Sequence, residues 1–412
     1  MSFLNWQRGR TIRTRKATED RDINELRKIS ALPGGFGGEQ ERRMAWGVLL
    51  GIECIGKDEE EYKVHKDEDQ VRLDTNRSFV TYPKNVAADN KEKMQEDLQE
   101  LIVGVLRKYP SLSYFQGYHD ILSVFYLTFI SEGTSQKDST EWSDLKRCAE
   151  AVSLNRVRDA MGSGMEGMMG LLCILKRVLK AADLELYSFS AKISPVPTLP
   201  FFALSWVLTL FSHDCDEVEP VQRMFDFLLA RNPIFAVYLA AAILIAKKPQ
   251  LFALAKQLGQ EYRSDPSLLH PLFARLPPLY PDTPDSSDPP LPTPTLSDLD
   301  DPSAPNPYAP IKLSELFALA DSLSARYPWD GKLIKGRQVM GPGSVVTTYA
   351  AELQGWTAAQ VLAYVDVNVV LPGATSMEDE PEPDSSLQTV LTVGILLLGL
   401  GMAWYGNRWM QG

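Results

Sequence analysis

Apolar residues recur at intervals of three and four along most of the chain between residues 39 and 246. This spacing places them on one face of an α-helix, which must then pack against another helix. The clearest stripe ends at Pro110 and consists of Met94, Leu98, Leu101, Ile102, Val105 and Tyr109. Similar stripes run through residues 121–130, 165–179, 201–211, 221–229 and 235–245. No stretch alternates like a strand, so the sequence predicts an all-α fold of many packed, antiparallel helices.

The segment Phe201–Phe211 is apolar at almost every position. Its length of about eleven residues is too short to cross a bilayer, which needs about 20. We therefore expect a central helix of the core at this point in the chain.

The chain has 412 residues and a net charge of −11. This length predicts a core domain of about 200 to 250 residues with extensions. The acidic balance argues against a nucleic-acid partner, for which a basic domain is expected. Residues 1–29 form a basic N-terminal arm, which we expect to be a solvated tail. The arm has no apolar run, so it does not read as a signal peptide.

The four cysteines lie far apart, without the paired spacing of a zinc site. They are Cys54, Cys148, Cys173 and Cys215. His213 lies close to the last of them, but two ligands without a second pair do not make a metal centre. Free thiols in a reducing compartment are the favoured interpretation, which fits a cytosolic body.

Residues 276–310 differ abruptly in composition, with 12 prolines among 35 residues. Proline mixed with Asp, Ser and Thr buries too little apolar area to fold alone, so we expect a disordered linker. Helical spacing returns afterwards, and residues 311–372 are read as a C-terminal helical extension that can pack back onto the domain. An acidic linker, residues 373–386, follows.

Residues 387–405 contain no charged side chain and are apolar on all faces of a helix. As a helix they would be about 28 Å long, close to the hydrocarbon thickness of a bilayer. Trp404, Tyr405 and Trp409 suit the membrane interface. We expect a transmembrane tail anchor inserted after translation, with a cytosolic body. The short span favours the endoplasmic reticulum membrane, with the Golgi as an alternative.

Three short motifs occur in order along the predicted helical domain. The first is Arg42-Arg43-Met44-Ala45-Trp46-Gly47-Val48-Leu49-Leu50-Gly51. The second is Val71-Arg72-Leu73-Asp74-Thr75-Asn76-Arg77, and the third is Tyr114-Phe115-Gln116-Gly117-Tyr118-His119-Asp120. Together they resemble the R-x-x-x-W-x-x-L-L-G, I-x-x-D-x-x-R and Y-x-Q-G-x-x-D signature of the TBC-domain family of Rab GTPase-activating proteins. Val71 stands where that family usually has isoleucine, a change between two β-branched apolar side chains.

The resemblance implies that residues 30–275 form a TBC domain that activates a Rab GTPase in its GTP form. Arg77 would be an arginine finger and Gln116 a glutamine finger, both supplied in trans. A guanidinium stabilises the charge that develops on the transferred phosphoryl group, and an amide can orient the attacking water. The protein would carry no cofactor of its own, because GTP and Mg²⁺ arrive with the Rab. It would catalyse no independent reaction.

Six further residues of the motifs are expected to support the two fingers. They are Asp74, Tyr114, Gly117, Asp120, Arg42 and Trp46. Asp74 and Asp120 lie about one helical turn from a finger, so their carboxylates could orient the arginine or backbone amides. Gly117 allows the chain to approach a partner closely. The alternative is that both residues are ordinary aspartates at the ends of helices, without a role in the site.

Two other classes of function remain to be weighed. The resemblance also fits a catalytically inactive, membrane-anchored scaffold that binds a Rab, although such a scaffold needs neither Arg77 nor Gln116. A self-sufficient hydrolase is disfavoured, because Gly34–Gly38 is not followed by a Gly-Lys-Ser/Thr sequence and no nucleophile elbow is present. The identity of the Rab is a property of the surface, which motifs do not reveal.

Overall fold

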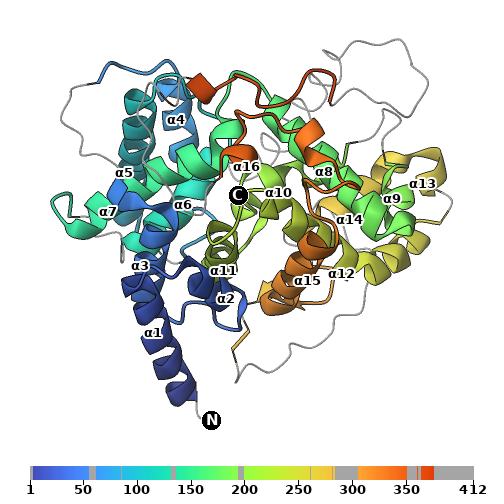
Figure 1. Ribbon diagram of the computed structural model, residues 1–412, viewed down its shortest axis with the longest axis horizontal. Coiled ribbons are helices and arrows are strands. Elements are labelled where there is room, and N and C mark those ends of the chain that lie inside the picture. The colour runs from blue at the N-terminus through green and yellow to red at the C-terminus, as the bar shows by residue number, and fades with distance from the viewer. Residues whose placement is uncertain are drawn as a thin grey trace.

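The computed structural model describes residues 3–54, 62–84, 86–130, 136–193, 199–259, 261–280, 282–283, 305–349, 360 and 363–374. Within them the chain is helical nearly throughout, and the helices surround a continuous apolar core (Figure 1). The predicted all-α fold is therefore confirmed. The transmembrane anchor predicted at residues 387–405 lies outside the described residues, as does nearly all of the predicted acidic linker.

The N-terminal half contains seven α-helices and a short 3-10 turn. These are α1 (Phe3–Glu19), α2 (Ile23–Ala31), α3 (Glu39–Leu50), η1 (Ile52–Cys54), α4 (Glu68–Thr75), α5 (Ala88–Lys108), α6 (Tyr118–Phe129) and α7 (Thr140–Val152). A π-helical stretch and a 3-10 turn then lead into the next two helices. They are η2 (Ser153–Val157), η3 (Arg158–Ala160), α8 (Glu166–Ala182) and α9 (Leu184–Ser190).

The second half begins with short helical turns and then forms the longest helix. Its elements are η4 (Phe201–Ala203), α10 (Leu204–Leu208), η5 (Ser212–Asp214), α11 (Val218–Leu229), α12 (Phe235–Gln257), α13 (Glu261–Ser264), η6 (Pro266–Leu269) and α14 (His270–Ala274). Two short strands and a C-terminal group of helices follow. They are β1 (Leu279–Tyr280), β2 (Ile311–Lys312), α15 (Leu313–Arg326), η7 (Gly336–Gln338) and α16 (Val345–Thr348).

Helix α5 forms where the sequence predicted it, and the physical signals at its end agree. Its apolar stripe is buried, with Leu98, Ile102 and Leu106 fully enclosed. The helix ends at Lys108, two residues before Pro110. A residue that precedes proline is disfavoured in the helical region, so the chain must turn there. That turn leads into the segment that carries Gln116.

Helix α12 is the centre of the core. It is apolar on nearly all faces, and Tyr238, Ile243 and Leu251 are fully buried. Among the described residues it is the one helix long and apolar enough to cross a membrane by length and composition, yet 61% of that apolar window lies inside the protein. Helices α8, α10, α14 and α15 pack around it (Figure 1). A helix apolar all round is expected at the middle of a large core.

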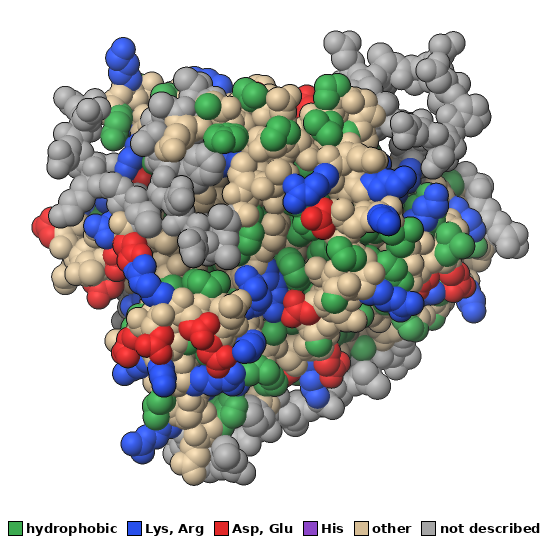
Figure 2. Space-filling view, viewed as in Figure 1, with side chains coloured by type: hydrophobic (Ala, Val, Ile, Leu, Met, Phe, Trp, Pro, Cys, Tyr) green, Lys and Arg blue, Asp and Glu red, His purple; other side chains and the backbone are tan. Residues whose placement is uncertain are grey.

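The basic N-terminal arm is not a solvated tail. Residues 3–31 form α1 and α2, which pack against α3 and α11 and bury Thr14, Leu26 and Ile29. Its arginines pair with carboxylates: Arg13 with Glu25 at 2.6 Å and Arg15 with Glu41 at 2.8 Å. Acidic and basic side chains interleave over these helices at the lower left of Figure 2. Part of the arm's positive charge is thus paired with carboxylates within the fold.

The segment Phe201–Phe211 is mostly buried, as expected for the core. The prediction that it forms one continuous helix is wrong. The α-helix covers only Leu204–Leu208, after a 3-10 turn. Leu210 and Phe211 have φ angles of 51° and 70°, in the left-handed region where a right-handed helix cannot continue. The Thr209 hydroxyl donates to the Ser205 carbonyl at 2.8 Å, which helps the chain leave the helix.

The expected linker at residues 276–310 is ordered at both of its described ends. Leu276 and Tyr308 are buried, and the Tyr308 hydroxyl donates to the Leu272 carbonyl at 2.6 Å. Strands β1 and β2 pair in parallel, with Leu279 opposite Ile311. The chain thus leaves and re-enters the domain at neighbouring points, and residues 284–304 lie outside the described part.

Helix α15 packs on α12 and on α11, so the C-terminal extension belongs to the same core. Phe317 stacks on Phe227 with ring centroids 4.3 Å apart. Arg231, which is buried just after α11, binds Asp321 through Nε at 2.8 Å and a terminal nitrogen at 2.7 Å. The Arg231 guanidinium also donates to the Ser30 hydroxyl of α2 at 2.9 Å. One arginine therefore connects helices from both ends of the chain.

The described chain after α15 runs back over α8 mostly in turns, and the helical extension expected there is limited to the short elements η7 and α16. Met340 bridges to Val370, and Ala374 is the last described residue. The Arg158 guanidinium donates to the Gly343 carbonyl at 2.9 Å, and the Ser163 amide donates to Asp366 at 2.7 Å. The part of the extension that is docked thus reaches Ala374, slightly past the boundary expected at residue 372.

Candidate functional site

Arg77 lies just beyond the C-terminal end of α4. Its backbone amide donates to the Asp74 carbonyl at 3.1 Å, which continues the last turn of the helix. The Arg77 side chain is exposed and makes no hydrogen bond or ion pair with the described residues. Helix α4 is itself fixed to α5, because Arg107 binds the Glu68 carboxylate with two bonds of 2.7 and 2.8 Å. The exposed guanidinium therefore extends from a firmly held helix end.

Gln116 lies in the turn between α5 and α6. Its side chain is half-buried, and its amide has no hydrogen-bond partner among the described residues. Gly117 follows with a φ of 104°, a conformation that side chains rarely adopt, and caps α6. A Cβ atom at this glycine would come within 2.7 Å of Thr209 Cγ2. The turn thus requires glycine for its backbone and for the close packing behind it.

A buried hydrogen bond joins these two segments. The Tyr114 hydroxyl donates to the Asp74 carboxylate at 2.9 Å, and the Tyr114 amide donates to Asp67 at 2.9 Å. Gln70 also donates to Asp74, at 3.1 Å. Burial and the nearby Asp74 charge raise the pKa of Tyr114 well above its usual value, so its hydroxyl keeps the proton that it donates. Asp74 therefore holds the motif of Gln116 against the motif of Arg77.

His119 and Asp120, in the first turn of α6, extend this network. His119 Nδ1 lies 2.9 Å from the Tyr114 hydroxyl oxygen, and its Nε2 lies 3.3 Å from Asp120. His213 Nδ1 lies 2.8 Å from the other oxygen of Asp120. Burial would raise the pKa of the Asp120 carboxyl, but the two imidazoles outweigh burial and lower it. The expected bond from the arginine finger to either aspartate is not formed.

The sequence did not identify His213 as part of this site. It lies 93 residues after Asp120 and was considered only as a neighbour of Cys215. No local spacing connects the two segments, so only the packing of η5 against α6 brings them together. Of the cysteines whose side chains are described, Cys148, Cys173 and Cys215 are all buried free thiols.

Arg42 and Trp46 lie in a different place from the two fingers. Arg42 binds Asp226 of α11 through two nitrogens at 3.0 and 3.3 Å, and the Trp46 indole donates to the same carboxylate at 2.8 Å. Arg223 donates to it at 3.1 Å. All four side chains are buried. This cluster joins α3 to α11, so the first motif stabilises the fold.

The glycine-rich segment Gly34–Gly38 wraps around arginines and does not form an anion-binding loop. Arg10 donates to the Gly35 carbonyl at 2.5 Å, and a Cβ atom at Gly35 would come within 2.0 Å of the Arg223 guanidinium. The space that a phosphate would need is therefore filled by the protein's own side chains.

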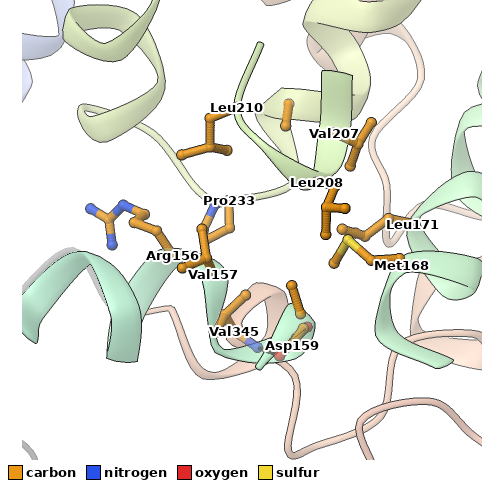
Figure 3. A pocket seen from close by; sticks show the side chains of 12 residues that line it. Arg156, Val157, Asp159, Met168, Leu171, Val207, Leu208, Leu210, Pro233 and Val345 are labelled. Atoms are coloured by element: carbon orange, nitrogen blue, oxygen red, sulfur yellow. Dashed lines mark hydrogen bonds between the residues drawn. The ribbon is translucent and has the colours of Figure 1, made fainter. Parts of the chain in front are cut away.

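A cavity of about 20 Å³ lies between η2, α8 and α10 (Figure 3). Val207, Leu208, Met168 and Leu171 lie on one side of it, and Arg156 lies on the other. A volume of this size holds about one water molecule. It cannot admit a nucleotide or a metabolite.

The structure thus places Arg77 and Gln116, both without a side-chain partner among the described residues, on two joined segments of a mostly helical domain. A profile of the Rab-GTPase-TBC domain matches residues 39–252, and the chain belongs to that family. The resemblance of the three motifs is thereby confirmed. The match runs from α3 to most of α12, and α1, α2 and α15 lie outside it but pack on the same core.

Similar proteins include TBC1 domain family member 20 of Homo sapiens, 30% identical over 238 residues, which are 56% of this chain and 55% of that protein. The GTPase-activating protein gyp10 of Schizosaccharomyces pombe is 29% identical over 262 residues, covering 62% of this chain and 64% of the relative. The GTPase-activating protein GYP8 of Saccharomyces cerevisiae is 33% identical over 227 residues, covering 52% and 44%. The match thus spans little more than half of the human relative's length.

Among solved structures, the chain is similar to a flagellar RabGAP TBC domain of Chlamydomonas. The identity is 14% and the TM-score 0.41, over 66% of this chain and 93% of that structure. The family assignment does not depend on this likeness.

Proposed function

We propose that this protein activates a Rab GTPase in its GTP form by supplying Arg77 and Gln116 in trans. One observation carries the proposal. Both side chains lack a partner among the described residues, although the polar groups around them are bound to one another. Polar side chains at the surface of a firmly held site, left without a partner in the free protein, are suited to contact a second molecule. The names of gyp10 and GYP8 as GTPase-activating proteins support this assignment.

The chemistry assigns a separate task to each finger. The Arg77 guanidinium would neutralise charge on the γ-phosphoryl oxygens as the bond to the leaving group breaks. The Gln116 amide would orient the attacking water in place of the Rab's own glutamine. GTP and Mg²⁺ would be carried by the Rab, and this protein would catalyse no reaction alone. Asp74 and Tyr114 act by fixing the distance between the two segments.

The membrane part of the proposal concerns residues 387–405, the uncharged apolar run. We propose that it anchors the domain to the endoplasmic reticulum or Golgi membrane, with the domain in the cytosol. Twelve residues, 375–386, lie between the docked end at Ala374 and this run. A chain of that length reaches about 43 Å at most. The domain would therefore meet only Rabs bound to the same or an adjacent membrane.

A panel of GTP-loaded Rabs, assayed for phosphate release with the full-length protein in detergent, tests the proposed function. At least one Rab should be stimulated, and the same Rab should bind the protein in the presence of a non-hydrolysable GTP analogue. A Rab that binds but is not stimulated would favour the alternative, a catalytically inactive scaffold. If no Rab of a complete panel is bound or stimulated, the proposal is wrong.

A further inference from the structure

The turn between α10 and α11 contacts both finger segments. It comprises residues 209–213 and is called the 209–213 turn below. The Tyr82 hydroxyl, five residues after Arg77, donates to the Ser212 carbonyl of this turn at 3.1 Å. Thr209 packs directly behind Gly117, where a Cβ atom would come within 2.7 Å of its methyl group. The 209–213 turn, which is remote in the sequence, therefore contacts both the segment that follows Arg77 and the segment that follows Gln116.

The 209–213 turn has a well-defined conformation of its own. Leu210 and Phe211 hold left-handed backbone angles, which persist only where the surroundings determine them. Phe211 is fully buried and stacks on Trp206 with ring centroids 6.1 Å apart. The Ser212 hydroxyl and the His213 amide bind the carbonyl and the hydroxyl of Thr209, at 2.7 and 3.3 Å. The turn is therefore a stable platform against which the Gln116 segment rests.

The contact between His213 and Asp120 is an ion pair at the edge of this platform. Burial alone would lower the pKa of the His213 imidazole, but Asp120 at 2.8 Å and the nearby Asp214 raise it to about 9. The other charged groups close by are His119, which faces Asp120, and Asp216 and Glu217 on the chain that follows. Glu217 lies 3.5 Å from Lys84. At neutral pH the imidazolium is thus paired with the aspartate that ends the glutamine motif.

We propose that His213 is a positioning residue for Gln116: it holds Asp120, and with it the first turn of α6, so that the glutamine side chain is presented in one orientation. This inference rests on the proposed function. His213 does not contact the partner's nucleotide in this scheme and acts only through the Asp120 carboxylate. The glutamine precedes the helix by two residues, so a shift of that first turn displaces the amide directly. A displacement of about 1 Å in a reacting group can cost about 100-fold in rate.

A role of His213 in stabilising the fold can be distinguished from a positioning role by comparing the melting temperature with the stimulated rate. Its side chain is 32% exposed and that of Asp120 is 22% exposed, so the pair is partly screened by water. Partly exposed ion pairs contribute little to the free energy of unfolding. Replacing His213 should therefore leave the melting temperature nearly unchanged while altering the rate of the stimulated reaction.

A double-mutant cycle in the full-length protein tests the inference. The variants are His213→Ala, Gln116→Ala and the combination, assayed in single turnovers at saturating protein on an unmodified Rab, on which Arg77 should still give a measurable stimulated rate when Gln116 is absent. His213→Ala should lower the rate by about 10- to 100-fold without weakening binding of the GTP-analogue form. In the Gln116→Ala background the same change should have less than about a 2-fold effect, because its target is gone. His213→Asn keeps a hydrogen-bond donor and should recover part of the rate.

Lys84→Ala, which breaks the exposed ion pair with Glu217 beside the turn, is the matched control and should behave as the unmodified protein. A loss for His213→Ala that is equally large without Gln116 would overturn the inference, because the histidine would then act on Arg77 or on the whole fold.

Hydrogen–deuterium exchange of the free protein supplies a readout that needs no Rab. His213→Ala should speed exchange of the backbone amides of residues 115–120, and Lys84→Ala should not. Unchanged exchange together with an unchanged rate contradicts the positioning role. If exchange at residues 115–120 rises but the unmodified protein stimulates no Rab in the panel, the structural effect of His213 on this segment is supported. The proposed function is then wrong instead.

Discussion

At the scale of single residues, Arg77 contrasts with the buried arginines of the domain. Arg42, Arg156, Arg223 and Arg231 are buried and bind carboxylates or carbonyl oxygens. Arg77 is exposed and has no partner among the described residues. The buried arginines stabilise the fold, whereas the exposed one is available to a second protein.

Replacing Arg77 by alanine should abolish most of the stimulated GTP hydrolysis, by about 10³- to 10⁵-fold if it behaves like other arginine fingers. Arg77→Lys should recover little, because an ammonium lacks the planar, two-pronged guanidinium. Phosphate release in single turnovers measures the effect. Arg72→Ala is the control, since Arg72 lies on the same helix and only forms an exposed pair with Asp69. Near-normal stimulation by a folded alanine variant would refute the assignment.

For Gln116, the informative change is made in the partner. A Rab whose own catalytic glutamine is replaced should still respond to this protein, because the amide that orients water comes from outside. Gln116→Ala should abolish that response. The stimulated rates of the two Rab forms are compared in the same assay. If the altered Rab does not respond while the unmodified one does, the glutamine acts within the Rab and the two-finger mechanism is wrong.

The motifs pointed to Asp74, Tyr114 and Asp120 as residues that support the two fingers, but they did not predict which of these residues contact one another. Asp74, three residues before Arg77, and Tyr114, two residues before Gln116, come together where α4 packs against α5 and α6. His213 could not be predicted, since its contact depends on the tertiary packing of a turn 93 residues away. Arg42 and Trp46 belong to the same family signature, yet they bind Asp226 in the core. A family's sequence signature therefore includes residues that stabilise the fold as well as residues of the site, and the motif alone does not distinguish the two.

At the scale of elements, helices with a long apolar stripe were predictable and the short ones were not. The stripe of α5 and its terminal proline are local signals. By contrast, α1 and α2 were read as a charged tail, because charge counts do not show which arginines will meet Glu25 or Glu41. The turn after α10 was read as helix, because its apolar composition hides two left-handed residues. Turns of this kind are decided by tertiary packing.

The turn that carries Gln116 depends on one glycine. Gly117→Ala should lower the stimulated rate by about 10-fold or more, because alanine is strained at a φ of 104° and its Cβ would collide with Thr209. The matched control is Gly104→Ala in α5, where a Cβ meets nothing within 4 Å. That change should stabilise the helix by about 0.5–1 kcal/mol and leave the rate unaltered. Equal rates for both variants would contradict the requirement for glycine.

The contact of α3 with α11 depends on Asp226, which is fully buried and is shared by two arginines and a tryptophan. Asp226→Asn removes the only negative charge of this cluster and should lower the free energy of unfolding by about 3–5 kcal/mol. Urea denaturation measures the change. Asp69→Asn, at an exposed pair with Arg72, should change it by less than about 0.5 kcal/mol. A small effect at Asp226 would mean that the arginines find other partners.

At the scale of the whole molecule, the described chain ends in a docked segment and not in a free linker. Ala374 still accepts a contact from the Cys173 thiol at 3.8 Å, and its amide donates to the Leu371 carbonyl at 3.0 Å. The domain and the proposed anchor are therefore separated by residues 375–386. Twelve residues of chain couple them in space without requiring a shared packing surface.

Truncation after Ala374 should yield a protein that stimulates Rab in solution as the full-length protein does, but that no longer resides on membranes. Fractionation with carbonate extraction measures the second effect, and phosphate release measures the first. Full-length protein that washes off with carbonate would show that residues 387–405 do not span a membrane. A cut after residue 338 is the control, because it removes the strand-like contact of Met340 with Val370 and should destabilise the domain.

Arg231 has a consequence for how the protein is made. Its buried guanidinium reaches Ser30 of α2 and Asp321 of α15, and the aspartate is synthesised 90 residues after it. At about 5–20 residues per second, a ribosome needs roughly 5 to 18 s to make that interval. Throughout that time the nascent chain carries an arginine without its carboxylate, and α15 is not yet present to cover the surface of α11. The domain thus closes late in translation, well after the residues that define its family have left the ribosome.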